Sequence, residues 1–248
     1  MFVSSARGML HAYEGFDYTT VCQLLNAFTT VDLSAFYADV SKDRLYTFAA
    51  RSRERRSAQT AMYVMADGLS RLFAPVLSFT MDEAWRHLPG TREESVHIAT
   101  FPTSETLANL EDQALTADWD RLSAIRAEVL AEIEPLRKNK QIGSSLQARV
   151  VLSATPEEQP LLERYARDLP MLFIVSEVEV RPAPADGGAP RITIERATGV
   201  KCQRCWRYVP SISSEPEWAG LCSRCIDALS GPGSTAQPSG AGVGPAAG

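Results

Sequence analysis

Two pairs of cysteines in the last quarter of the chain constrain its fold more than any other feature. Cys202 and Cys205 form one C-x-x-C pair, and Cys222 and Cys225 form a second after a spacer of sixteen residues. Each pair lets two thiolates converge on one ion, and the spacer can bring both pairs into one tetrahedral site. Thiolate-only tetrahedral sites favour zinc or iron–sulfur chemistry, and a spacer of this length is typical of zinc. We therefore predict that these four cysteines bind one Zn²⁺ ion.

The predicted zinc site is structural, because four protein ligands leave no position open for water or substrate. The surrounding segment is poor in apolar residues, so the metal would supply most of its stability, about 10–16 kcal/mol in small zinc modules. Two disulfides are the alternative. Arg7 and Gly8 interrupt the region where a signal peptide would be apolar, which favours reduced cysteines and a cytoplasmic location. The fifth cysteine, Cys22, lies in an apolar stretch and is predicted to be a small buried side chain rather than a nucleophile.

Composition is that of a folded chain. Apolar residues make up 45% of the 248, and no apolar run approaches the ~18–20 residues that span a bilayer. Thirty acidic residues exceed twenty-five basic ones, which gives a net charge of −5. This balance argues against indiscriminate nucleic-acid binding but says nothing about local basic patches. No grouping of serine, histidine and carboxylate residues indicates hydrolysis, so we predict no catalytic residue.

Hydrophobic periodicity predicts a helix bundle in the first half of the chain. Arg55–Phe73 repeats apolar residues at steps of three and four, and Pro75 should bend or end this helix. Thr80–Glu83 is a capping-box sequence, and Leu88–Gly90 should stop the short helix that it begins. Three more amphipathic helices are expected, over residues 16–28, 33–48 and 113–140.

The pattern becomes strand-like after Gly143. Strands are predicted over residues 146–152, 172–180 and 192–195, with a short helix near 156–169, which makes a small α/β unit. A turn-rich segment over residues 182–190 should separate the last two strands. The last nineteen residues hold six glycines, three prolines and no charge, and are expected to be a disordered tail. The predicted domains are a helical domain (1–112), a helix with the α/β unit (113–196), the zinc module (197–229) and the tail (230–248).

Short blocks of the sequence resemble class I aminoacyl-tRNA synthetases of the isoleucine–valine–leucine group. Blocks in the helical region that resemble the group are Val31–Tyr37, Lys42–Tyr46, Arg55–Thr60 and Phe73–Trp85. Lys140–Leu146 and Lys201–Trp206 are similar to the bacterial isoleucyl family in particular, whereas valyl enzymes typically end in a coiled-coil arm. The resemblance runs in the family's order from about residue 13 to residue 229.

The resemblance implies a mainly α fold: an anticodon-binding helix bundle, then a small α/β unit and a four-cysteine zinc module. The bundle would grip the anticodon stem and loop of isoleucine tRNA, and the zinc module would lie beside it. Trp206 matches the position of an aromatic residue near the anticodon loop. Independently of the family, its place between Arg204 and Arg207 combines a stacking face with phosphate-pairing charge. A second interpretation stays open, in which Trp206 covers the small core of the zinc module.

A locally basic stretch agrees with an RNA partner. Between Asp39 and Arg56, six basic residues face three acidic ones, although a solvated helix face with ion pairs would show the same pattern. Arginine suits phosphate because its planar fork binds two oxygens at once. The candidate tRNA contacts are Trp206, Arg204, Arg207, Arg55, Arg56, Lys42 and Arg44.

The motifs that the family uses to bind ATP are absent from this sequence. None of His11, His87 and His97 stands in a His-x-Gly-His arrangement, and none of the four lysines lies in a Lys-Met-Ser-Lys-Ser type loop. The resemblance therefore covers only the C-terminal portion of such an enzyme, whose upstream catalytic and editing domains would be the partner of this portion. ATP would be a cofactor only of that complete enzyme, and this chain alone is expected to be noncatalytic, with no membrane or DNA partner.

Two other classes of protein remain as alternatives. Formamidopyrimidine-type DNA glycosylases end in a similar four-cysteine finger, but Met1-Phe2-Val3 does not match their N-terminal catalytic proline region. The other alternative is a stand-alone RNA-binding module.

Overall fold

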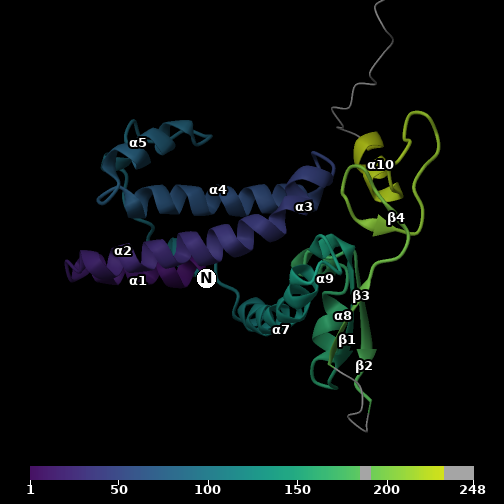
Figure 1. Ribbon diagram of the computed structural model, residues 1–248. Coiled ribbons are helices and arrows are strands. Elements are labelled where there is room, and N and C mark those ends of the chain that lie inside the picture. The colour runs from purple at the N-terminus through teal and green to yellow at the C-terminus, as the bar shows by residue number, and fades with distance from the viewer. Residues whose placement is uncertain (185–190, 232–248) are drawn as a thin grey trace, which may run out of the picture. The chain divides into compact units, whose positions relative to one another are not determined.

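A computed structural model describes residues 1–184 and 191–231 (Figure 1). Its contacts divide the chain into two units, one of residues 1–42 and 57–127 and one of residues 43–56 and 128–248. The second unit thus includes a short segment, 43–56, that the first unit flanks on both sides in the sequence. Each unit is described by itself.

The first unit is a set of helices around an apolar core. Helix α1 (Phe2–Glu14) packs against α2 (Tyr18–Ala27), and the ring centroids of Phe2 and Phe28, the residue after α2, are 5.8 Å apart. Ala6 and Met9 are wholly buried on α1 because they fall one helical turn apart on the same face. Leu72, from the end of α4 (Arg53–Phe73), is also wholly buried in this core. The predicted helix bundle is confirmed.

The helix that begins at Tyr18 is longer than the sequence pattern indicates. Two separate helices were expected, over 16–28 and 33–48, but the backbone stays helical through a π-helical segment, η1 (Phe28–Ala38), into α3 (Asp39–Thr47). A π-helical turn is wider than an α-helical turn, so its side chains do not follow the 3.6-residue period. The hydrophobic periodicity is therefore interrupted although the backbone stays helical. The prediction for Cys22 was also wrong: it is exposed, since the buried stripe of α2 runs through its neighbour Val21.

Helix α4 ends at Phe73, two residues before Pro75, as predicted. The capping box was not confirmed. Helix α5 (Ser78–His87) begins two residues before Thr80, and its N-cap residue, Leu77, makes no side-chain cap hydrogen bond. Asp82 instead accepts hydrogen bonds from the Ser95 hydroxyl (2.6 Å) and the Val96 amide (3.3 Å), which holds the following loop to the helix. Two short helices follow, η2 (Val96–Ile98) and α6 (Ser104–Ala108).

The helix predicted over 113–140 is α7 (Gln113–Lys138), which continues through Pro135. Four apolar side chains of α7 are buried at steps of three and four residues, namely Leu122, Ile125, Val129 and Ile133, whereas Leu115 is exposed. Part of this helix belongs to each unit. No helix in the described ranges 1–184 and 191–231 combines the length and the apolar character that a membrane span requires.

The second unit contains the predicted α/β structure. After η3 (Ser145–Gln147), the central strand β1 (Ala148–Ala154) pairs in parallel with β2 (Glu177–Pro182) and in antiparallel with β3 (Ile192–Arg196). The crossover from β1 to β2 carries α8 (Gln159–Arg164) and α9 (Leu169–Leu172), as a parallel pair requires. The strand expected over 172–180 begins only at Glu177, because Pro170 starts a helical turn that buries Leu172 and Phe173.

Two predicted features lie wholly or partly outside the described residues. The turn-rich segment near 182–190 is described only to residue 184. Of the predicted tail, Ser230 is the last residue of α10 (Ser223–Ser230), and residues 232–248 lie outside the described part.

Candidate metal centre and nucleic-acid interface

A short hairpin carries the first cysteine pair. Strands β4 (Val200–Lys201) and β5 (Tyr208–Val209) pair in antiparallel, and Cys202 and Cys205 lie in the turn between them. Gly199, just before the hairpin, has φ +96°, and a Cβ atom there would lie 2.1 Å from the Val209 carbonyl oxygen. Only glycine therefore fits at this position.

The second pair is placed by the start of α10. Cys222 is the N-cap residue of this helix and Cys225 lies in its first turn. The two pairs are tied together by the backbone, since the Gln203 amide donates to the Gly220 carbonyl (3.0 Å) and the Cys222 amide donates to the Cys202 Sγ (3.4 Å). A helix N-terminus also favours the thiolate form of a cysteine.

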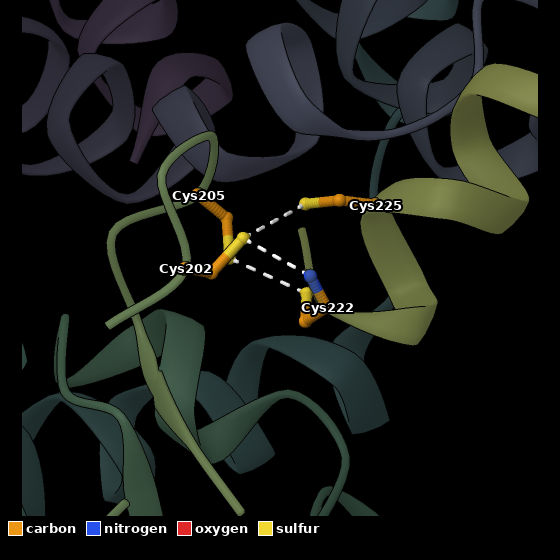
Figure 2. A group of neighbouring side chains, drawn as sticks. All are labelled: Cys202, Cys205, Cys222 and Cys225. Carbon is orange, nitrogen blue, oxygen red and sulfur yellow. Dashed lines mark hydrogen bonds between the residues drawn. The ribbon is translucent and has the colours of Figure 1, made fainter. Parts of the chain in front are cut away.

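The four sulfur atoms converge on one point (Figure 2). All lie within 4.8 Å of one another, and the Cys202–Cys225 and Cys205–Cys222 sulfur separations are both 3.8 Å. Two thiolates bound to one tetrahedral zinc ion at 2.3 Å stand about 3.8 Å apart. A disulfide would need about 2.0 Å, and all four cysteines are free. The donor set fits a structural zinc ion held by Cys202, Cys205, Cys222 and Cys225.

The environment of the sulfurs favours charge on part of the cluster. The pKa of Cys205 is lowered to about 4, first by the hydrogen bond from the Cys225 thiol and then by the Arg207 amide and the Arg224 guanidinium. The same hydrogen bond, together with burial, raises the pKa of Cys225. Zinc binding requires the cysteines that ligate the ion to lose their thiol protons.

Little apolar material surrounds the cysteines. Only Val209, Ile212 and Leu221, all partly buried, pack on them among the described residues. Trp206 is not part of this small core: it is 60% exposed, its indole N–H donates to the Gln203 carbonyl (3.1 Å), and the Lys201 ammonium lies 5.5 Å from its ring centroid. Its backbone has φ +63°, a left-handed conformation within the turn that links the two strands.

Arg204 caps a helix from a distant part of the sequence. Its guanidinium donates to the carbonyl oxygens of Thr47 (2.5 Å) and Tyr46 (3.2 Å), the last two residues of α3, and approaches the Cys225 Sγ at 3.6 Å. The last carbonyls of a helix lack intrahelical partners and carry the negative end of the helix dipole, so an arginine there satisfies both. The zinc module is thereby joined to the segment 43–56, within the second unit.

Asp43 is the second link between this segment and the zinc module. It accepts a two-point hydrogen bond from Arg224 (2.7 and 2.8 Å), one from Arg207 (2.9 Å) and one from Thr47 Oγ1 (2.7 Å). Burial would raise the pKa of Asp43, but the hydrogen bonds and charges of Arg224 and Arg207 outweigh it and lower that pKa. The Arg224 guanidinium also lies 5.3 Å from the ring centroid of Phe48. Sheet residues add a further tie, since Ser176 Oγ accepts from the Tyr208 amide (2.7 Å).

The structure gives the candidate tRNA contacts different environments. Trp206 and Arg56 are exposed, and Lys42, in the first unit, is exposed and pairs with Asp39 (2.8 Å). Others have protein partners: Arg44 pairs with Asp168 (2.6 Å), and Arg55 donates weakly to the Phe48 carbonyl (3.4 Å). The structure therefore brings together the hairpin residues Arg204, Trp206 and Arg207 with the segment that holds Arg44 and Arg55.

Sequence reasoning missed the roles of Asp43 and Arg224. One signal was available, because an arginine stands third in both cysteine pairs, Cys-Gln-Arg-Cys and Cys-Ser-Arg-Cys. Both arginines, Arg204 and Arg224, contact segment 43–48. These contacts join residues 157 to 181 positions apart in the sequence, which a local sequence pattern does not reveal.

The fold and this centre define a helical domain that carries a structural four-cysteine zinc finger. A family model described as "Anticodon-binding domain of tRNA ligase" matches residues 6–152, and one described as "Zinc finger found in FPG and IleRS" matches residues 199–228. The chain belongs to the anticodon-binding domain family of tRNA ligases.

Relatives of the chain carry a more specific name. The isoleucine–tRNA ligase of Syntrophotalea carbinolica is 44% identical over 225 residues, which cover 88% of this chain and 24% of that protein. The isoleucine–tRNA ligase of Stenotrophomonas maltophilia is 39% identical over 222 residues, which cover 90% of this chain and 23% of that protein. The chain thus spans about a quarter of the length of the curated relatives that it matches.

Proposed function

We propose that the chain recognises the anticodon stem and loop of isoleucine tRNA, as the tRNA-binding portion of an isoleucine–tRNA ligase. The observation that carries this proposal is the order of two modules in one chain, an anticodon-binding domain over residues 6–152 and a zinc finger over residues 199–228. Similarity to isoleucine–tRNA ligases over nearly nine-tenths of the chain supports the choice of isoleucine.

The second unit offers the chemistry that an unpaired RNA loop requires. Trp206 is 60% exposed and Tyr46 is 74% exposed, and the carbonyl of Tyr46 is bound by Arg204, two residues before Trp206. Exposed aromatic rings stack on splayed bases, and each such contact contributes about 1–3 kcal/mol. In this proposal Trp206 stacks on a base of the anticodon loop.

Positive charge for the RNA backbone comes from the same unit. Arg51, Arg53 and Arg56 are exposed along residues 51–56, and Arg55 lies half-buried among them. We assign phosphate contacts to the exposed members of this stretch and keep Lys42 as a predicted contact on the first unit. Arg44, Arg204 and Arg207 already bind protein groups, so in this proposal they orient the surface and add to its potential.

The chemical steps of charging would take place in the remainder of the complete enzyme, in the cytoplasm. There ATP would activate isoleucine as an adenylate before transfer to the tRNA. In this proposal the four cysteines of this chain hold a zinc ion whose role is structural, because four protein ligands leave no open coordination position. Other residues of the chain bind and orient the tRNA.

Binding to three nucleic acids tests the proposal. We expect the 248-residue chain, loaded with zinc, to bind an isoleucine tRNA transcript, and to bind the same transcript more weakly when the anticodon is replaced. A duplex DNA with an oxidised base serves as the competitor, since the model that matches residues 199–228 is described as a zinc finger found in FPG as well as in IleRS. Preference for the duplex, or equal affinity for both anticodons, would overturn the proposal.

A second measurement tests whether the chain alone catalyses the activation of isoleucine. With isoleucine and ATP, the chain alone should form no adenylate in a pyrophosphate-exchange assay. Adenylate formation would show that the chain holds a catalytic centre of its own.

A further inference from the structure

Three arginines of the zinc module converge on the end of one helix. Arg204 reaches the carbonyls that end α3, and Arg207 and Arg224 both reach Asp43 in the same helix. The side chains of Asp43 and Arg207 are only 17% and 16% exposed, so their ion pair lies in a region of low dielectric. Charges so placed interact strongly, and either one left alone would be costly.

The geometry at Asp43 is that of a specific link. Arg224 meets both carboxylate oxygens, at 2.8 Å for Oδ1 and 2.7 Å for Oδ2, which is the planar two-point arrangement that only arginine makes with a carboxylate. Arg207 and Thr47 fill further acceptor positions of the carboxylate. Four donated hydrogen bonds therefore saturate Asp43, and three of them come from the zinc module.

Charge at this junction is balanced by groups from both sides. A zinc ion with four thiolates carries two net negative charges, and Asp43 adds one. The three guanidinium groups supply three positive charges, and two of them also approach cluster sulfurs: Arg204 lies 3.6 Å from Cys225 Sγ, and Arg224 interacts with Cys205. Asp43 completes this neutral set from outside the zinc module.

We propose that Asp43 is the positioning residue that docks the zinc module on the end of α3 and so holds Trp206 where RNA meets it. The inference rests on the proposed tRNA function for its consequence but not for the docking itself. The side chain of Asp43 is hydrogen-bonded to Arg207, Arg224 and Thr47 rather than to a cysteine, and its role is therefore separable from metal binding.

The substitution Asp43→Asn tests the docking. It keeps the shape of the side chain and removes the charge that two arginines share. Hydrogen exchange of the zinc-loaded chain, measured by mass spectrometry without RNA, should become faster in residues 43–48 and 202–207 and stay unchanged in β1. Zinc content should remain that of the unsubstituted chain. Unchanged exchange in both segments, or loss of the zinc, would overturn the proposal.

The consequence for RNA is measured separately. We expect Asp43→Asn to weaken binding of the isoleucine tRNA transcript about tenfold, equivalent to about 1.4 kcal/mol. Asp43→Glu, which restores the charge on a longer stem, should recover part of the affinity. The matched control is Asp227→Asn, an exposed aspartate one turn after Arg224 in α10, which should change neither exchange nor affinity.

A double-substitution cycle decides whether Asp43 acts through Arg224. If it does, Asp43→Asn combined with Arg224→Gln weakens RNA binding by much less than the product of the two single effects. Independent effects would overturn the link, as would faster exchange with unchanged RNA affinity. If the unsubstituted chain binds no tRNA, the proposed function fails, while the exchange measurement still tests the docking.

Discussion

In the helical unit, Ala6, Met9 and Leu72 are wholly buried among apolar neighbours, whereas the zinc module packs only three partly buried apolar side chains on its four sulfurs. The helical unit can draw its stability from the hydrophobic effect, at about 25 cal/mol for each Å² of apolar surface removed from water. The zinc module has too little such surface and depends on the metal and on arginine links. These two parts of one chain should therefore respond to different perturbations.

The largest expected effect is loss of the zinc module on removal of its metal. Either a chelator or Cys222→Ser should abolish zinc binding, because the structural ion contributes about 10–16 kcal/mol to such modules. Exchange protection in residues 199–230 should disappear while the helical circular dichroism signal of the first unit persists. The exposed Cys22 provides the control, since Cys22→Ser should leave the zinc in place. Zinc content unchanged in Cys222→Ser would contradict the four-ligand site.

The dependence of the first unit on apolar burial is tested in its helical core. Leu72→Ala removes a wholly buried side chain and should lower the free energy of unfolding of the first unit by about 2–5 kcal/mol. Thermal denaturation gives this value, and zinc content should not change. Leu77→Ala, at a side chain that is 41% exposed, is the matched control. An equal effect at both positions would mean that the core is not where the structure has it.

A smaller effect is expected at the exposed face of the zinc module. Trp206→Ala should weaken binding of isoleucine tRNA by about 1–3 kcal/mol with zinc retained, because one base loses its stacking partner. Trp206→Phe keeps an aromatic face and should retain most of the affinity. If both variants bind as the unsubstituted chain does, the Trp206 side chain contributes only to the structure of the hairpin.

Two adjacent arginines separate phosphate contact from structural support. Arg56 is exposed, whereas Arg55 is half-buried, and its side chain donates to the Phe48 carbonyl. Arg56→Gln should reduce the salt dependence of RNA binding by about one ion, the amount expected for one lost phosphate contact. Arg55→Gln should leave the slope unchanged and lower stability instead. A reduced slope in Arg55→Gln would make Arg55 a phosphate contact as well.

The smallest effect concerns acid. Hydrogen bonds from Ser95 and the Val96 amide, together with the Arg86 charge, hold the pKa of Asp82 below its usual value. A carboxylate with a lowered folded-state pKa stabilises the fold above its unfolded pKa, and this contribution disappears as pH falls through the folded value. The melting temperature should therefore decrease when the pH is lowered below about 4, and this decrease should be smaller in Asp82→Asn. On acidification, the zinc module should lose its metal at a higher pH than the pH at which the contribution of Asp82 is lost. Its thiolates must stay deprotonated to bind the ion.

Much of the helical region and the ligand set of the metal centre could be predicted from the sequence, because both depend on spacing along the chain. Helix α4 follows from an apolar repeat and a proline, and the zinc site follows from two C-x-x-C pairs. The π-helical segment could not be predicted in this way, since its period differs from the one that sequence patterns use. The partners of Arg204, Arg207 and Arg224 were also beyond prediction, because tertiary packing decides whether an arginine meets solvent, a helix end or a carboxylate.

The cap on α3 has a consequence for the order of events in synthesis. The carbonyls of Tyr46 and Thr47 receive their hydrogen bonds from Arg204, more than 150 residues later in the chain. A ribosome that adds about 5–20 residues each second leaves this helix end without its partner for about 8–30 seconds. During that interval the carbonyls that end α3 have no arginine to bind them and are open to water. Completion of the metal-binding hairpin is thus the event that caps this helix end.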